Sequence, residues 1–290
     1  MRRINKTGAF TLVEILTTMV IIGILLAVLI PALNQVNKSA MNVKQKAQFH
    51  TLEMGLETFR TDTGDYPASY FLLDPSLSSE SYCSSQRLAE AMIGRDGLGF
   101  HPSSLYHPKG LADMDSDGAI DDLVYHAQTD MSYETALQNR QARKGPYLEL
   151  ESANAVKLSD IYLNYSSLAN SYVLVDSFSK VKHRTTGKKI GMPILYYRAD
   201  RNKIGNDPTT PLLNTYNIYD ATNGLLSLDP PFGGSHPMRS NYTLFYSRIR
   251  NPNFTSPDRP YRSESFILQS AGYDGLFGTA DDVYNFDEGK

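Results

Sequence analysis

The strongest constraint on this chain is an apolar stretch close to its N-terminus. Over Ile15–Leu33 the only polar side chains are Thr17 and Thr18. A helix with 18 or more apolar residues is long enough to cross the hydrocarbon core of a bilayer. Glu14 directly precedes this stretch, and an isolated charge at such a depth costs about 2.5–3.5 kcal/mol. We therefore predict a transmembrane segment over residues 10–33, in which Glu14 needs a partner.

The residues around Glu14 form a motif. The run Gly8-Ala9-Phe10-Thr11-Leu12-Val13-Glu14 resembles the processing site of prepilins, the precursors of type IV pilus and type II secretion pseudopilus subunits. The resemblance implies a basic leader, residues 1–9, that a prepilin peptidase removes before Phe10. The new amine is then methylated, and Glu14 becomes the fifth residue of the mature chain, where it acts in assembly. Gly usually precedes the cut in this family, so cleavage after Gly8 stays open beside the Ala9 junction that we favour.

An ordinary signal sequence is the alternative for this N-terminus. A cleaved signal peptide has a short apolar region that ends in small residues before its cut, whereas here the apolar run is long and ends at Leu33-Asn34-Gln35. An uncleaved anchor explains the length of the run but not Glu14. The prepilin interpretation explains both features, and Gly23 and Pro31 fall where the family often has Gly and Pro.

Charge and cysteine content limit the classes of protein that remain. The formal net charge is −3, and the leader holds three cations and no carboxylate, so its removal shifts the charge to −6. A strongly basic nucleic-acid binder is thereby excluded. Cys83 is the single cysteine, so no internal disulfide can form. Lys and Arg are equally frequent on both flanks of the apolar run, so placement of the head in the periplasm, with a single-pass anchor in the inner membrane, rests on the resemblance.

The hydrophobic pattern after Pro31 is that of an amphipathic helix. Apolar residues recur at spacings of three and four, and the members are Val36, Ala40, Val43, Ala47, Leu52, Leu56 and Phe59. We predict one long helix over residues 10–63, with a transmembrane half, an amphipathic half and a kink or locally melted turn at Pro31. Gly64, with Pro67 close behind, ends it.

The remainder, residues 64–290, is predicted to be a globular head. Residues 68–150 form a loop-rich insertion with short helices at Gln86–Ile93 and Tyr133–Arg143, the first with one apolar face. Short strands rich in β-branched and aromatic residues are predicted at Tyr172–Val175, Pro193–Tyr197, Tyr242–Tyr246 and Ser265–Leu268. Residues 200–241 carry many Pro, Gly and Asn residues and are predicted to be a long loop. The fold class is therefore α+β, a long N-terminal helix with a small antiparallel-sheet head.

Two acidic runs are candidate calcium loops, because Ca²⁺ takes six to eight oxygen ligands from carboxylates and carbonyls. The first, residues 270–283, resembles the calcium loop of major pseudopilins, which implies Asp274, Asp281 and Asp282 as ligands. In the second run the first half of an EF-hand-type loop is matched by Asp113, Asp115, Asp117 and Asp121, with Gly118 at the turn. Val124 stands where the bidentate Glu of an EF-hand belongs. A solvated acidic turn is the alternative for both runs.

No combination of residues in this sequence is typical of catalysis. The six histidines are scattered, and neither a dinucleotide fingerprint nor a phosphate-binding loop is complete. We therefore predict that the chain is not an enzyme. The resemblance implies a pseudopilin with calcium as its ion, and it implies as partners sister subunits, a prepilin peptidase and an inner-membrane assembly platform with its ATPase. A type IV pilus subunit, or a membrane-anchored calcium-dependent adhesion module that uses the prepilin export route, is the alternative.

Overall fold

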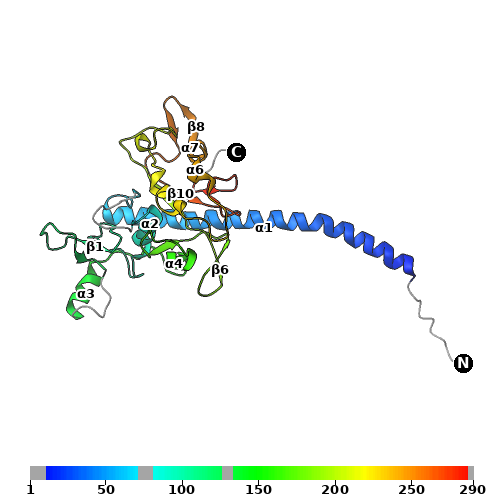
Figure 1. Cartoon of the computed structure of the whole chain (residues 1–290), viewed down its shortest axis with the longest axis horizontal. Helices are drawn as coiled ribbons and strands as arrows, with labels where there is room; N and C mark the ends of the chain where they lie inside the picture. The colour runs from blue at the N-terminus through cyan, green and yellow to red at the C-terminus, as the bar shows by residue number, and fades with distance from the viewer. Residues whose placement is uncertain (1–10, 71–80, 126–132, 287–290) are drawn as a thin grey trace. The chain divides into compact units, whose positions relative to one another are not determined.

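The computed structural model describes residues 11–70, 81–125 and 133–286 (Figure 1). It divides the chain into two compact units, Met1–Val43 and Lys44–Lys290. The processing residues Gly8, Ala9 and Phe10 lie outside the described residues. The first unit is helical where it is described, and the second is the head.

Helix α1 (Leu12–Thr63) is a single helix of 52 residues, about 78 Å long at 1.5 Å per residue. It continues through Pro31, so the melted turn expected there is absent. Pro31 removes one N–H donor, and a long helix tolerates this loss when its neighbouring turns continue. The predicted end is confirmed: Gly64 has φ 93°, and its N–H donates to the Arg60 carbonyl at 2.8 Å.

The first unit leaves its apolar side chains exposed. Among the described residues, α1 is the one helix long and apolar enough to cross a membrane. Its most apolar 18-residue window has a mean hydropathy of 2.7, and none of that window is buried. So much contiguous apolar surface is not stable in water. This helix therefore needs a bilayer or other helices around it.

The head is built on the C-terminal part of α1. Of the predicted amphipathic stripe, Leu52, Leu56 and Phe59 are buried, whereas Ala47 is exposed and Phe49, outside the prediction, is buried with them. Val36 and Val43, which continue the same stripe in the first unit, remain exposed. The Phe59 ring meets the Phe100 ring edge-on at 5.0 Å, so the insertion that follows α1 contributes to this core.

Helix α2 (Ser84–Ile93) confirms the predicted helix, and its polar face is buried as well as its apolar face. All ten of its residues are buried, and it packs against β4 (Tyr172–Leu174) and β7 (Leu195–Arg198). Its polar side chains therefore need internal partners. Gln86, for example, donates from Nε2 to the Ala169 carbonyl at 2.6 Å and to Ser171 Oγ at 2.7 Å.

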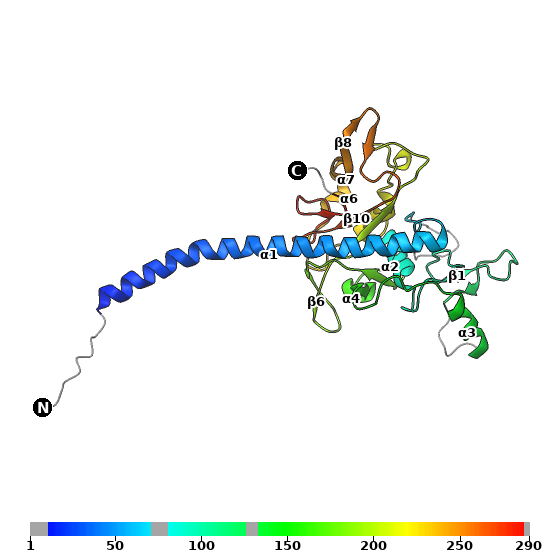
Figure 2. The same cartoon turned by 180° about the vertical axis from the view of Figure 1, so that it is seen from behind.

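The main sheet has three antiparallel strands in the order β11–β10–β7, with β10 at Phe266–Ser270 and β11 at Val283–Tyr284. Register places Leu268 opposite Tyr196 and Gln269 opposite Tyr284. Figures 1 and 2 show β10 beside the C-terminal half of α1. The other antiparallel pairs have two strands each: β1 (Leu111–Ala112) with β2 (Asp122–Leu123), β3 (Ala155–Lys157) with β4, β5 (Val181–Lys182) with β6 (Lys189–Ile190), and β8 (Arg250–Thr255) with β9 (Asp258–Pro260).

Three of the four predicted strands are confirmed, as β4, β7 and β10, but the strand predicted at Tyr242–Tyr246 is wrong. That segment belongs to helix α7 (Thr243–Ile249), whose Phe245, Tyr246 and Ile249 are buried. Phe245 packs on the Tyr197 ring with centroids 4.7 Å apart. Packing against the sheet has overridden the β-preference of these aromatic residues, because β-propensity depends strongly on context.

Short helices occupy much of the remaining chain. The predicted helix at residues 133–143 is confirmed as α3 (Tyr133–Ala142). Loops predominate over residues 200–241, as expected, and are interrupted by single turns of helix. The remaining short helices are α4 (Leu158–Ile161), η1 (Pro211–Leu213), α5 (Tyr219–Thr222), η2 (Leu225–Ser227) and α6 (Pro237–Ser240).

A buried carboxyl joins three segments of the head. Asp176 is 2% exposed, and its Oδ2 accepts from Ser270 Oγ at 2.7 Å. Its Oδ1 accepts from the N–H groups of Phe178 at 3.2 Å and Met192 at 3.1 Å. Burial raises the pKa of Asp176 from 3.8 to about 7 because removal from water disfavours the charged form.

The raised pKa of Asp176 predicts a particular pH dependence of stability. The unfolded chain releases this proton near pH 4, whereas the folded head keeps it to about pH 7, so the folded state binds more protons between these values. Raising the pH from 4 to 7 should therefore lower the free energy of unfolding through this group, by at most about 4 kcal/mol. Asp176→Asn should flatten the profile in this window. Urea unfolding of a soluble head from Asn37 onward measures this, and parallel profiles for the two proteins would contradict it.

Candidate functional site

The first turn of α1 supplies Glu14 with a partner inside its own chain. Oε2 of Glu14 accepts from the Thr11 N–H at 2.8 Å and from Thr11 Oγ1 at 2.9 Å. The Glu14 N–H donates back to Thr11 Oγ1 at 3.3 Å. This reciprocal arrangement is a capping box, which satisfies N–H groups that the start of a helix leaves free. The Thr-x-x-Glu signature of this cap is readable in the sequence at Thr11 and Glu14.

The capping box lowers the free-energy cost of placing the Glu14 carboxylate in an apolar environment. One carboxylate oxygen is engaged locally, which offsets part of the cost of burying the charge. Within residues 11–70, 81–125 and 133–286, the other oxygen, Oε1, has no hydrogen-bond donor in the structure. Glu14 can therefore keep its helix cap and still bind a cationic group from another molecule.

The C-terminal loop brings together two of its three predicted ligands. Oδ2 of Asp281 accepts from the Asp274 N–H at 2.9 Å, and Oδ1 accepts from Thr279 Oγ1 at 2.6 Å. Burial, together with the nearby charge of Asp281, raises the pKa of Asp274. Gly272 has φ 65°, and a Cβ there would lie 2.1 Å from the Asp281 carbonyl oxygen, so this turn requires glycine.

Asp282, the third predicted ligand, points into the head. It is 6% exposed, and its Oδ2 accepts from Gln269 Nε2 and from the Gly278 N–H, both at 2.8 Å. Burial raises its pKa to about 7. In this conformation Asp282 stabilises the loop and strand β10 (Phe266–Ser270), and it does not share one ion position with Asp274 and Asp281.

The loop between β1 and β2 gathers a different acidic group. Across the described parts of the chain, one set of three acidic or metal-binding side chains has ligand atoms within 4.8 Å of one another, namely Asp113, Asp115 and Asp122. Antiparallel pairing of β1 and β2 sets Ala112 opposite Asp122, and this places Asp122 beside Asp113. Asp122, which the sequence analysis did not select, thus replaces the predicted Asp117 and Asp121 in the group.

Hydrogen bonds within this loop orient its carboxylates. Oδ2 of Asp113 accepts from the Gly118 N–H at 3.1 Å, and Gly118 has φ 92°. Oδ2 of Asp122 accepts from the N–H groups of Met114 at 2.8 Å and Asp115 at 3.3 Å. Three carboxylates this close repel one another, and a hard divalent cation would relieve that repulsion. The donor set is therefore suited to calcium.

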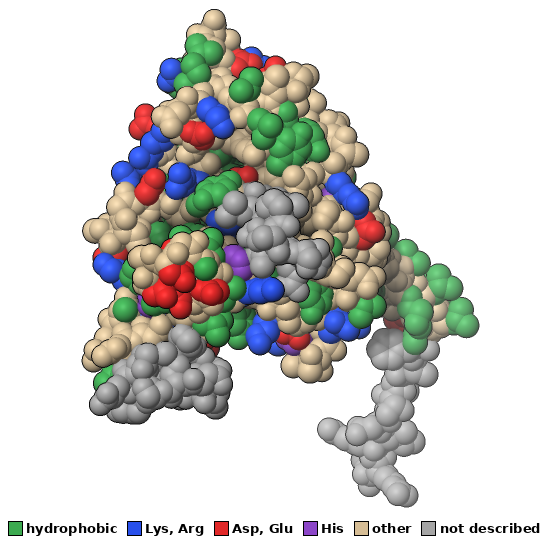
Figure 3. Space-filling model, turned by 60° about the vertical axis from the view of Figure 1, so that its left-hand side comes forward, with side chains coloured by type: hydrophobic (Ala, Val, Ile, Leu, Met, Phe, Trp, Pro, Cys, Tyr) green, Lys and Arg blue, Asp and Glu red, His purple; other side chains and the backbone are tan. Residues whose placement is uncertain are grey.

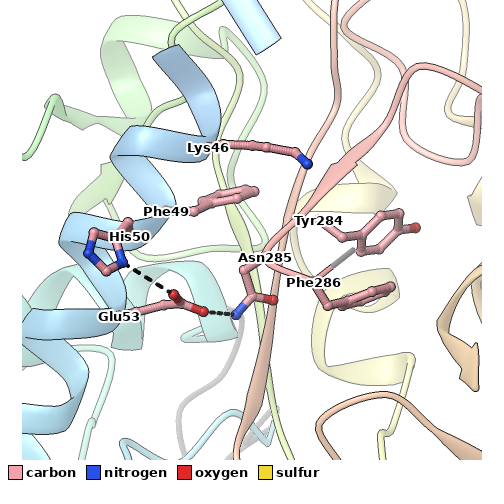
Figure 4. A pocket seen from close by; sticks show the side chains of 7 residues that line it. All are labelled: Lys46, Phe49, His50, Glu53, Tyr284, Asn285 and Phe286. Atoms are coloured by element: carbon pink, nitrogen blue, oxygen red, sulfur yellow. Dashed lines mark hydrogen bonds and ion pairs between the residues drawn. The ribbon is translucent and has the colours of Figure 1, made fainter. Parts of the chain in front are cut away.

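A polar cavity of about 120 Å³ lies between α1 and the C-terminal segment of the chain (Figure 4). Glu53 is its central charged group: Oε1 accepts from Asn285 Nδ2 at 2.9 Å and lies 2.7 Å from Arg262 Nη1. His50 Nδ1 is 3.9 Å from the other carboxylate oxygen. These contacts fasten the end of the chain to the helix. Their chemistry is that of an ion-pair clamp, because Glu53 is already engaged by its neighbours.

Comparison with known families supports the N-terminal assignment. Residues 4–30 match the family model described as the prokaryotic N-terminal methylation motif. The N-terminal segment is that of a type IV prepilin-like protein. The match covers Glu14 and most of the exposed apolar part of α1, and a prepilin-type motif implies processing by a peptidase and assembly with other pilin subunits. Neither the curated proteins nor the solved structures that were compared with the chain gave a match.

The Glu53 clamp of this prepilin-like protein predicts a loss of stability on truncation. Glu53→Ala removes the partner of Arg262 and of Asn285, which are both part-buried, and should lower the free energy of unfolding of the soluble head by about 1–3 kcal/mol. Glu151→Ala, at an exposed position, is the matched control and should change it by less than about 0.5 kcal/mol. Equal stability of the two variants in chemical denaturation would contradict the clamp.

Proposed function

We propose that this chain is a pseudopilin, a structural subunit of a type II secretion-like pseudopilus. In this proposal a prepilin peptidase removes residues 1–9, and the mature subunit waits in the inner membrane with its head in the periplasm. An assembly platform and its ATPase then draw it into a filament with sister subunits. The C-terminal loop, with its resemblance to major pseudopilins, favours a pseudopilus over a pilus.

The observation that carries the proposal is the position of Glu14 on an otherwise apolar, exposed helix. Apolar side chains pack in many registers with similar energies, whereas a charge in an apolar medium is strongly penalised wherever it lacks a partner. The amine created by cleavage before Phe10 would be a cationic partner for the open oxygen of Glu14 in a neighbouring subunit. Glu14 would then select one axial register among the many packings that the apolar surface of α1 allows.

Substitutions at Glu14 separate its charge from its helix cap. Glu14→Ala removes both and should leave the protein in the membrane while it lowers filament yield at least about tenfold, the effect of a lost charge pair worth 1.4 kcal/mol or more. Glu14→Gln keeps an oxygen that can cap the helix but has no charge, and it should be equally defective. Thr18→Ala is the matched control, because Thr18 Oγ1 bonds within the helix to the Ile15 carbonyl at 2.9 Å.

Membrane fractions and sheared filaments of the four proteins, wild type included, give the readout. Normal filament yield from Glu14→Ala would overturn the proposed role. It would then favour the anchored adhesion module, which uses the same export route without assembly. Normal yield from Glu14→Gln alone would show that the cap, and not the charge, is what assembly requires.

We also propose calcium as the ion of the head. The support is strongest at the β1–β2 loop, where Asp113, Asp115 and Asp122 have ligand atoms within 4.8 Å of one another. At the C-terminal loop Asp274 and Asp281 are adjacent, but Asp282 would have to leave its bonds to Gln269 and Gly278 in order to join them. Calcium at both loops would cross-link long irregular segments in a head that has no disulfide.

Paired substitutions distinguish the two loops. Asp115→Ala with Asp122→Ala should remove the calcium-dependent rise in melting temperature of the soluble head, because two of three clustered carboxylates are lost. Asp274→Ala with Asp281→Ala tests the C-terminal loop, and Asp282 stays unchanged because its removal would destabilise the core whether or not calcium binds. Metal content and thermal unfolding, each with calcium and with chelator, are the measurements. No bound calcium in the wild-type head would overturn the proposal.

A further inference from the structure

A polar groove lies beside strand β9 (Asp258–Pro260) in the head. It has a volume of about 260 Å³, and three cations contribute to its wall, namely Arg201, Lys203 and Arg259. Ile204 adds an apolar surface and is 55% exposed. Glu264 is the one carboxylate in the lining. The groove is thus suited to a ligand that is both acidic and apolar.

The cations of the groove differ in how far they are neutralised. Arg201 lies 3.5 Å from Asp65, and Lys203 lies 3.0 Å from Asp200. Arg259 is exposed, its guanidinium lies 5.9 Å from the centroid of the half-exposed Phe254 ring, and no ion pair to it is found among the described residues. Its charge is therefore available to a partner. An Arg beside an exposed aromatic ring is typical of the residues that dominate protein interfaces.

The same chain carries a surface of complementary character on the β1–β2 hairpin, residues 111–123. Asp117 and Asp121 are exposed and lie outside the group formed by Asp113, Asp115 and Asp122. Met114 and Ile120 are 45% and 47% exposed, so apolar side chains accompany the acidic ones. Figure 3 shows a compact group of acidic side chains bordered by hydrophobic ones, with Lys and Arg elsewhere on that face.

The two surfaces cannot meet within one molecule. In Figures 1 and 2 the β1–β2 hairpin extends past the C-terminal end of α1, whereas β8 (Arg250–Thr255), which pairs with β9, rises from one side of the head. Two different surfaces that fit each other on separate copies form a heterologous contact. Such contacts repeat head to tail and build open filaments when the rotation between copies does not close.

We propose that the groove beside β9 receives the β1–β2 hairpin of a second copy of this chain. Arg259 meets Asp117 or Asp121, and Met114 and Ile120 cover Ile204 and Phe254. The proposal rests on the filament proposed above. It adds to that filament a head-to-head contact that acts together with the packing of α1. The hairpin extends past the C-terminal end of α1 (Figures 1 and 2), so in the proposed filament it can reach a neighbouring subunit.

Cross-linking in the full-length protein tests the contact. Cys83 is 1% exposed, so thiols introduced at the surface react selectively with a short bismaleimide. Asp117→Cys combined with Arg259→Cys in one chain should give a ladder of covalent oligomers in calcium-containing membranes. Each single variant should give no ladder. Co-expression of the two single variants should stop at dimers, because only one junction can form between them.

Charge reversal provides the second measurement. Arg259→Asp should lower filament yield by about tenfold through like-charge repulsion, and Asp117→Arg with Asp121→Arg should do the same. The combination of all three reversals should restore most of the yield. Arg184→Asp, at an exposed position outside the groove, is the control for charge alone.

The outcomes separate this inference from the filament proposal. Normal filaments without a ladder and without an effect of charge reversal would overturn the hairpin contact only. No filaments and no ladder would overturn both. If the doubly substituted chain gave dimers and no larger species, a repeating head-to-tail contact would be excluded. Cross-links to a different protein would show that the groove has another acidic partner and would overturn the inference.

Discussion

The exposed apolar surface of α1 is the constraint on which the rest of this protein depends. Between Leu12 and Val43 nothing in the described part of the first unit buries it, so it must lie in a bilayer or among helices of the same kind. Both environments are apolar, so moving between them changes little hydrophobic free energy. The difference must then come from polar groups. Glu14, held through one oxygen by Thr11, is the charged group placed to make that difference.

A separate constraint applies to the head, in which long irregular segments must be stabilised without a disulfide. It uses buried and part-buried carboxyls that tie distant segments together. Asp176 joins the segment after β4 to β10, Glu53 joins α1 to the C-terminal segment, and Asp282 holds the C-terminal loop. Each of these carboxyls accepts from two or more donors, because a buried acceptor without donors would destabilise the fold. Calcium, in our proposal, would do the same for the loops at the surface.

The candidate sites could be predicted from the sequence only in part. The acidic loops and the position of Glu14 follow from residue types and spacing. Residue types and spacing do not show which carboxylates converge. Pairing of β1 with β2 decides that Asp122 rather than Asp121 joins Asp113 and Asp115. Likewise, Asp282 adjoins Asp281 in sequence but points into the core toward Gln269. Side chains of neighbouring residues can point to opposite sides of the chain, so neighbours in sequence can serve different environments.

The sequence by itself determined the long helix, its end at Gly64, the α+β class and the prepilin-type start. These depend on local preferences and on hydrophobic periodicity, which are properties of short segments. Only the tertiary structure decided that Tyr242–Tyr246 belongs to a helix and that all of α2 is buried. It also decided that Arg259 faces a groove. These features depend on contacts between residues far apart in the chain, and the free energy of those contacts outweighs local propensity.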